Sequence, residues 1–220
     1  MLYLKKISGL FTLFIGVVFS QSVSAQQSSI GILVIDGFLT SDVTAPVEVF
    51  GAATKKSWFS SYKVVIISAT KNRRVTSEEG LTIVSDKTIY DELDLDVLIL
   101  PSAYAMKDHI GNTKLIDFIR QTDKTASWMA SNCSGALLLG EAGILDGKKA
   151  TTWFGGEADL QKSYPAIDVQ FDQNVVVDDR VITSNGGPVS YEAAFMLLEK
   201  LSSKQFSNEI SNAIQFNRIK

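Results

Sequence analysis

Residues 126–143 read ASWMASNCSGALLLGEAG, and the change of pattern within them indicates the fold class. Its first part, Ala126–Ala130, is typical of a buried strand, and Ser134–Gly143, rich in leucine and alanine, predicts a central helix. The residues between them, around Cys133, are small and suit a sharp strand-to-helix turn. The stretch therefore predicts one unit of an α/β fold with Cys133 at its turn.

The chain on both sides alternates β-rich runs with amphipathic stretches. The predicted strands are Ser29–Ile35, Tyr62–Ser68, Asp96–Leu100, Val169–Asp172 and Asn174–Thr183, and the other predicted helices are Asp42–Ala53, His109–Gln121, Gly155–Ser163 and Val189–Leu201. Arg74–Val84 is interpreted as a hairpin-like excursion, and Lys204–Lys220 as a polar, weakly helical tail. This alternation predicts a doubly wound, mostly parallel sheet with helices on both faces, in one domain.

The N-terminus has the layout of a secretory signal peptide. Lys5 and Lys6 precede an apolar run, Ile7–Phe19, and Val23-Ser24-Ala25 is a small-residue cleavage pattern. The alternative, an uncleaved anchor, is less favoured because the run is shorter than the roughly 20 residues that span a bilayer. We therefore expect cleavage after residue 25 and a periplasmic or secreted protein without stable membrane insertion.

The predicted mature chain is mildly acidic. Two of the 21 Lys and Arg residues lie in the signal peptide, so 19 remain against 24 Asp and Glu, a net charge of −5. This balance gives no basic patch, and we expect no nucleic-acid partner. The acidic run Asp91–Asp96 is interpreted as a solvated turn, so we expect neither a metal nor a cofactor.

Cys133 is the only cysteine, so it cannot form an internal disulfide. At a helix N-terminus, unpaired N–H groups are expected to lower the pKa of the thiol and to favour the nucleophilic thiolate. The alternative is an inert, buried small side chain. Asp42 lies near the start of the helix that follows the first strand, so we expect it at the same sheet edge as Cys133. The alternative is that Asp42 is the N-cap residue of this helix.

Several segments together resemble the ThiJ/PfpI family. They are Ile32–Gly37, Asp42–Phe50, Asn132–Gly147, Ala150–Thr152 and Thr183–Gly187. The resemblance covers residues 29–202, with 203–220 as a C-terminal tail, and implies a flavodoxin-like, class I glutamine amidotransferase-like fold. The most similar subgroups are isonitrile hydratase-like members and the ligand-sensing domains of AraC-type regulators, and relatives are often homodimers.

The resemblance also implies roles for individual residues. Asp42 matches the acid that approaches Cys133, and Ser134 matches the position whose backbone N–H helps to form an oxyanion site. In isonitrile hydratase-like members this pair adds water to an isonitrile, giving an N-substituted formamide. Ser102 and Ala103 stand where many relatives carry two glycines, and Trp153 stands where the family often has histidine; these three residues are the predicted substrate contacts.

Three functions remain open at this point. The first is a cysteine-dependent hydratase or hydrolase of a small molecule, the second a non-catalytic small-ligand-binding protein, and the third a redox-responsive protein. His109, the only histidine, follows a strand that ends at the same sheet edge, but a solvated position near a helix start is favoured over pairing with the thiol. Tyr104, Trp153 and Phe154 are interpreted either as pocket walls or as core.

Overall fold

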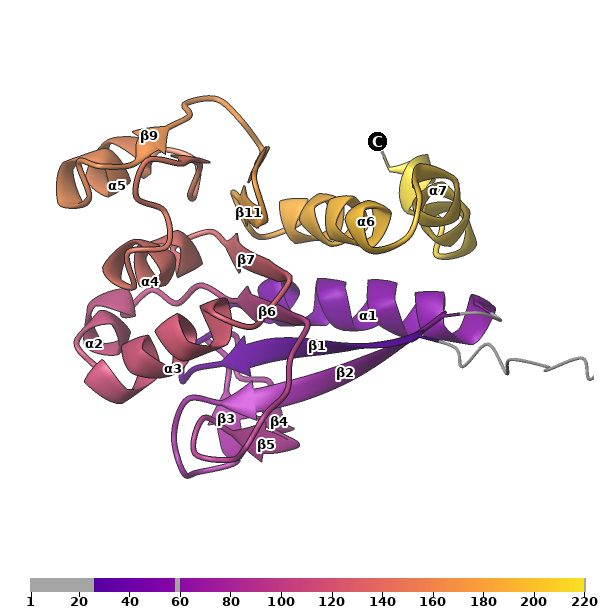
Figure 1. Cartoon of the computed structure of the whole chain (residues 1–220), viewed down its shortest axis with the longest axis horizontal. Helices are drawn as coiled ribbons and strands as arrows, with labels where there is room; N and C mark the ends of the chain where they lie inside the picture. The colour runs from indigo at the N-terminus through magenta and orange to yellow at the C-terminus, as the bar shows by residue number, and fades with distance from the viewer. Residues whose placement is uncertain (1–25, 58–59, 220) are drawn as a thin grey trace, which may run out of the picture.

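A parallel sheet runs through the centre of the protein. The computed structural model describes residues 26–57 and 60–219, so the predicted signal peptide lies outside the described residues. The strands lie in the order β10 (Val175–Asp178), β11 (Val181–Ser184), β7 (Trp128–Asn132), β6 (Val97–Leu100), β1 (Gln26–Val34), β2 (Ser60–Ser68) and β5 (Lys87–Thr88). All neighbours are parallel except β10 and β11 (Figure 1). This confirms the predicted doubly wound, flavodoxin-like α/β fold.

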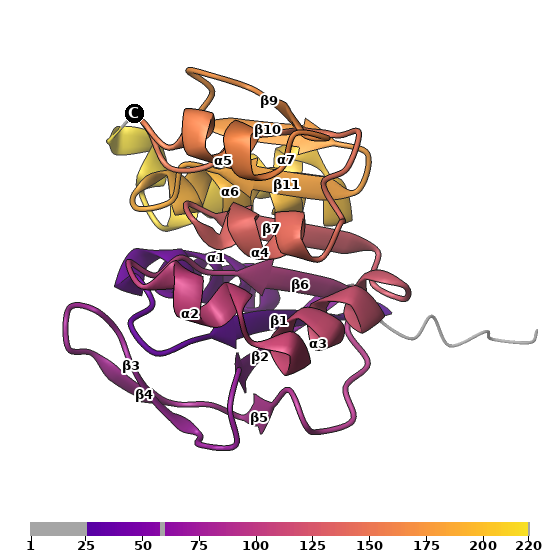
Figure 2. The same cartoon turned by 90° about the vertical axis from the view of Figure 1, so that its left-hand side faces the viewer.

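Helices cover both faces of this sheet (Figures 1 and 2). One face carries α1 (Thr40–Lys56), α6 (Val189–Leu201) and α7 (Lys204–Ala213), and the other carries α2 (Met106–Ile110), α3 (Thr113–Asp123) and α4 (Gly135–Glu141). The central strands are apolar on both sides, and all four residues of β6 are buried. Such strands are stable only between two helical layers, which places the core on both faces of the sheet.

Three predicted elements are wrong. The strand predicted over Val169–Asp172 is only the two residues of β9 (Asp168–Val169), and the left-handed φ of 56° at Asp172 is incompatible with a strand there. The helix predicted over His109–Gln121 is interrupted, because the Asn112 side chain accepts the Leu115 N–H at 3.3 Å and starts a new helix. The strand predicted over Asn174–Thr183 is the antiparallel pair β10 and β11. Its reversal lies at Asp179, whose φ of 53° is left-handed, and the valines on both sides of this turn conceal it in the sequence.

The C-terminal segment is helical and docked. Ser203 accepts the Phe206 N–H and so caps α7, whose Ile210 is fully buried. The Ser207 hydroxyl donates to the Phe195 carbonyl on α6 at 2.8 Å. A 3₁₀ turn over Phe216–Arg218 follows. The small elements β8 (Lys149–Ala150), α5 (Glu157–Ser163) and β9 (Asp168–Val169) lie beyond α4, near the β10 edge of the sheet (Figure 2).

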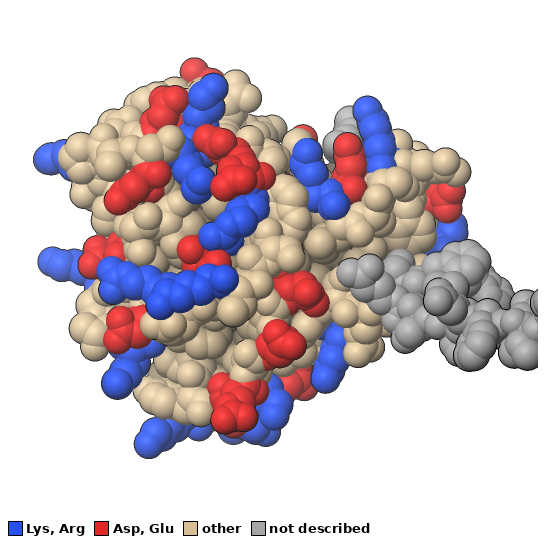
Figure 3. Space-filling view, viewed as in Figure 1, with Lys and Arg blue, Asp and Glu red and all other residues tan. Residues whose placement is uncertain are grey.

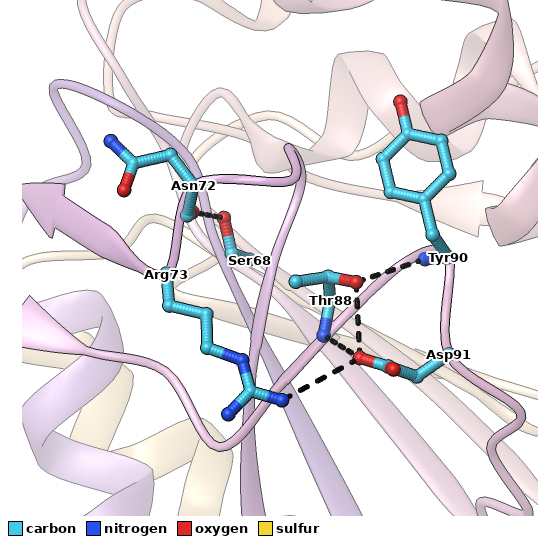
Figure 4. A network of polar contacts seen from close by, with 6 residues as sticks. All are labelled: Ser68, Asn72, Arg73, Thr88, Tyr90 and Asp91. Carbon is cyan, nitrogen blue, oxygen red and sulfur yellow. Dashed lines mark hydrogen bonds and ion pairs between the residues drawn. The ribbon is translucent and has the colours of Figure 1, made fainter.

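The excursion between β2 and β6 contains the antiparallel hairpin β3 (Arg74–Thr76) and β4 (Thr82–Val84), as predicted. Polar contacts hold its base (Figure 4). Asp91 accepts the N–H of Thr88 at 2.7 Å and its hydroxyl at 3.0 Å, and the Arg73 guanidinium lies 4.0 Å away. The Thr88 bonds, first the N–H and then the hydroxyl, hold the pKa of Asp91 below its ordinary value. Asp91 therefore stabilises this loop as a turn residue.

Charged side chains of both signs are interspersed over the face of the molecule shown in Figure 3. None of the helices in the described part of the chain combines the length and the apolar character needed to cross a membrane.

Candidate active site

Cys133 occupies a strained turn between β7 and α4. Its φ of 51° is left-handed, which is uncommon for a residue other than glycine. Three hydrogen bonds fix its backbone: its N–H donates to the Ser184 carbonyl at 2.8 Å, and its carbonyl accepts the Ala136 N–H at 3.2 Å and the Thr152 hydroxyl at 2.9 Å. The strand-to-helix turn predicted from the sequence is confirmed, and neighbouring elements hold it in place.

Two glycines make room for this turn. A Cβ on Gly135 would lie 2.7 Å from the Leu100 carbonyl oxygen, so glycine lets the start of α4 approach the end of β6. A Cβ on Gly186, whose φ is +76°, would lie 2.4 Å from Cys133 Cβ and 3.1 Å from Asp42 Oδ1. Cys133 and Asp42 therefore border the same space beside Gly186, as expected for two residues at one edge of the sheet.

Asp42 is fully buried in the first turn of α1 and accepts four hydrogen bonds. Its Oδ2 accepts the Ser102 N–H at 3.0 Å and the Ser102 hydroxyl at 2.5 Å. Its Oδ1 accepts the Gly187 N–H and the Ser190 hydroxyl, both at 2.9 Å. The alternative role of Asp42 as an N-cap residue is wrong, because α1 begins at Thr40 and its N-cap residue is Leu39. The carboxyl group instead joins α1 to the loops that follow β6 and β11.

Asn132 and Ser184, which the sequence did not single out as functional, support this arrangement. The Asn132 side chain donates to the Asp42 carbonyl at 3.1 Å and accepts the Ser184 hydroxyl at 2.6 Å. These bonds connect the ends of β7 and β11 to α1. Ser190 was also missed, because its contact with Asp42 spans 148 positions and no local pattern marks it.

Ser134 joins α4 to the loop after β6. Its hydroxyl donates to the Ala103 carbonyl at 3.0 Å, and the Ala103 N–H reaches the same hydroxyl at 3.3 Å. The backbone N–H of Ser134 favours the thiolate of Cys133 and so acts to lower the pKa of the thiol. The position of that N–H beside the sulfur is what an oxyanion donor requires, and this role stays a prediction.

The ionisation of Cys133 differs from the sequence expectation. Burial raises the pKa of the thiol, and the negative charge of Asp42 raises it further; hydrogen bonds from Ser102 and Ser134 oppose both effects. The expected lowering of the thiol pKa by the helix N-terminus is therefore wrong. The helix α4 has only seven residues, and desolvation of a thiolate outweighs what its first turn offers.

Asp42 is affected in the same direction. Burial raises the pKa of its carboxyl group, while the four donors from Ser102, Ser190 and Gly187 counteract that shift. The negative charge of Asp42 penalises a thiolate on Cys133, so the pair is best described as sharing one negative charge. Because the four donors all point at the carboxylate, they favour the charge on Asp42 and the proton on Cys133.

Cys133 opens into a cavity of about 560 Å³. This volume lies within the range of roughly 300–1,000 Å³ that is typical of small-molecule sites. The lining residues are Leu39, Ser102, Ala103, Tyr104, Met106, Lys107, Cys133, Ser134, Leu137 and Trp153. All the predicted site residues except Asp42 are among them, and Asp42 is covered by Ser102.

The remaining candidates lie outside this cavity. The His109 ring nitrogen Nε2 contacts the Asp36 carbonyl at 3.0 Å. Phe154 is exposed over 79% of its surface. Glu48 on α1 accepts the Tyr191 hydroxyl and thereby helps to raise the pKa of Tyr191 to about 12. Across residues 26–57 and 60–219, no three His, Cys, Asp or Glu side chains are grouped so that they could hold a metal ion.

Comparison with known proteins places this geometry in context. Residues 28–200 match the family described as the DJ-1/PfpI family. Isonitrile hydratase of Pseudomonas putida is 34% identical over 127 residues, which cover 58% of this chain and 54% of that protein. Protein dj-1beta of Drosophila melanogaster is 28% identical over 120 residues, which cover 54% of this chain and 63% of that protein. The chain thus spans less than two thirds of the length of both relatives.

Solved structures agree with the fold. The crystal structure of a ThiJ/PfpI family protein from Pseudomonas syringae superimposes with a TM-score of 0.77 at 24% identity, covering 94% of this chain and 82% of that one. At this identity the likeness establishes the architecture and says nothing of the substrate.

Proposed function

As this chain belongs to the DJ-1/PfpI family, we propose that it is an exported, cysteine-dependent hydratase that adds water to a small isonitrile and releases an N-substituted formamide. One observation carries this proposal: the thiol of Cys133 sits on a strained turn in a mostly apolar cavity, and the buried carboxyl of Asp42 borders the same space beside Gly186. The identity to isonitrile hydratase supports the choice of substrate class.

The reaction can be written with these two groups. The sulfur of Cys133 bonds to the terminal isonitrile carbon, and the thiol proton, held in the meantime by Asp42, is delivered to the same carbon. The product is a thioimidate, R–N=CH–S–Cys133. Water then adds to that carbon while the nitrogen is protonated, and the C–S bond breaks to release R–NH–CHO and the free thiol. The N–H of Ser134 faces the sulfur and the charge that develops beside it.

The cavity restricts the substituent on the nitrogen. Leu39, Met106 and Leu137 supply apolar surface, and Trp153 and Tyr104 supply aromatic surface. Such a lining favours an alkyl or aryl isonitrile over a strongly polar one. Lys107 is the only charged residue in the lining.

Hydration is measured by incubating the mature protein with alkyl and aryl isonitriles and following the formyl proton of the product by NMR. We expect catalytic turnover of at least one isonitrile small enough for the cavity, because Cys133, the proposed nucleophile, and Asp42, its proposed base, border the same space. Binding of these compounds without any formamide would refute the hydratase and favour the ligand-binding alternative.

The redox alternative has less support. A thiolate is the form that peroxide oxidises, and burial together with Asp42 raises the pKa of Cys133 and so disfavours this form. The same raised pKa requires the hydratase to remove the thiol proton as the substrate reacts, which is the role that the proposal gives to Asp42.

Export rests on the N-terminal pattern of residues 1–25. Expression of the full chain in a Gram-negative host is expected to place the protein in the periplasm with Gln26 as its first residue, as read by N-terminal sequencing. In Ala25→Leu the small residue at the cleavage site is lost, so the precursor should accumulate. Recovery of the unmodified chain in the cytosol with its N-terminus intact would contradict this proposal.

A further inference from the structure

Among the described residues that line the cavity beside Cys133, only Lys107 is charged. It lies on α2 and is exposed to solvent. Within residues 26–57 and 60–219, no carboxylate oxygen lies within 4.0 Å of its ammonium group, whereas the ammonium of Lys148 is paired with Asp179 at 3.1 Å. The protein therefore places a positive charge at this cavity and does not neutralise it.

The other polar side chains of the lining point to the same kind of ligand. The hydroxyls of Ser102 and Ser134 already donate to groups of the protein. In the part of the chain that the structure describes, the Tyr104 hydroxyl, the Lys107 ammonium and the Trp153 indole N–H make no hydrogen bond. All three are hydrogen-bond donors, and no carboxylate is among the lining residues. The unused polar groups thus suit a ligand that brings acceptor oxygens and a negative charge.

We propose that this cavity selects isonitriles whose substituent ends in a carboxylate, and that Lys107 and Tyr104 bind that carboxylate. The inference rests on the proposed function for the isonitrile group. The isonitrile carbon meets the Cys133 sulfur, and the apolar side chains of the lining hold the spacer between the two ends. A carboxylate offers two oxygens, one for each donor. Both donors are exposed, Tyr104 over 78% of its surface, so the charged end stays near water and its desolvation costs little.

Binding tests this recognition without turnover. The probes are N-formyl aminoalkanoates, which hydration of such isonitriles would release, and the primary amides that match them in shape. By isothermal titration calorimetry at low salt, we expect the wild type to bind the carboxylate about fivefold more tightly than the amide.

The matched variants are Lys107→Met and Lys114→Met. In Lys107→Met the preference for the carboxylate should fall to about one, because methionine keeps an apolar stem but has no charge. Lys114 is an exposed lysine on α3 outside the cavity lining, and Lys114→Met should keep the wild-type preference. Equal binding of the two probes by the wild type, or the same loss of preference in both variants, would overturn the inference.

Hydration of isocyano alkanoates and of their primary amides tests the same contact in turnover. The wild type should have a lower KM for the carboxylate with a similar kcat, because the charged end lies away from the reacting carbon. Lys107→Met should raise that KM by about fivefold, and added salt should weaken the wild-type preference, since exposed charges are screened.

The two proposals fail in different ways. Turnover of both compounds with the same KM would overturn the carboxylate site and leave the hydratase intact. Absence of any hydration, together with carboxylate binding that depends on Lys107, would refute the hydratase and support the carboxylate site.

Discussion

Replacing Cys133 with alanine is expected to lower isonitrile hydration by at least about a thousandfold, because covalent catalysis then loses its nucleophile. The Ser134 hydroxyl, which also lines the cavity, donates to the Ala103 carbonyl and is held away from that role. Hydration by Cys133→Ala is measured from the formyl proton of the product, at enzyme concentrations high enough to detect residual activity.

The fold of this variant should be retained. The contacts of residue 133 with Ser184, Ala136 and Thr152 are made by its backbone, and alanine keeps them. Thermal unfolding and binding of the formamide product are the controls. A folded Cys133→Ala protein that hydrates isonitriles within tenfold of the wild-type rate would show that the thiol is not the nucleophile.

Gly186→Ala is expected to crowd Cys133 directly and so to disrupt the site. The added Cβ would lie 2.4 Å from Cys133 Cβ and 3.0 Å from the Cys133 nitrogen, and φ at this position is +76°. Cys133 cannot yield easily, because its backbone is bonded to the Ser184 carbonyl. We expect the free energy of unfolding to fall by about 3 kcal/mol, the sum of overpacking and left-handed strain, and hydration to be lost.

Gly187→Ala is the matched control. Gly187 also has a positive φ, +58°, but its added Cβ would meet no atom within 4 Å. The free energy of unfolding of Gly187→Ala should therefore fall by only roughly 1–2 kcal/mol, the contribution of left-handed strain, and the residue 187 N–H should keep its bond to Asp42. Chemical denaturation of both variants gives the comparison. Equal losses of stability would show that crowding of Cys133 by residue 186 is unimportant.

Much of the site could be predicted because its signals are local. The small residues between a β-rich run and a leucine-rich run predict the Cys133 turn, and an acid near the start of the helix after the first strand predicts a carboxyl group at the same edge. Parallel strands bring both to one place, since their carboxyl ends meet there. The central strands could also be predicted, because a strand that is buried on both faces has a continuous apolar run in its sequence.

The rest depends on contacts between segments far apart in the sequence. The thiol pKa was predicted in the wrong direction because desolvation depends on how α1, β6 and β11 close around Cys133, and a sequence shows only the adjoining helix. The side chain of Ser102 was read as a departure from a glycine pair, whereas its hydroxyl binds a carboxyl group 60 positions away. The turn at Asp179 was hidden because valines flank it on both sides.

Cys133 and Asp42 are expected to act as one unit that shares a single proton, and the pH dependence of Cys133 alkylation in the wild type and in Asp42→Asn measures this coupling. The negative charge of Asp42 raises the pKa of the thiol, so its removal should move the midpoint of alkylation to lower pH. Isonitrile hydration by the same variant should nevertheless fall, because the proton acceptor is gone. A midpoint that stays in place or rises in folded Asp42→Asn would show that the Cys133 thiol and the Asp42 carboxyl group are not coupled.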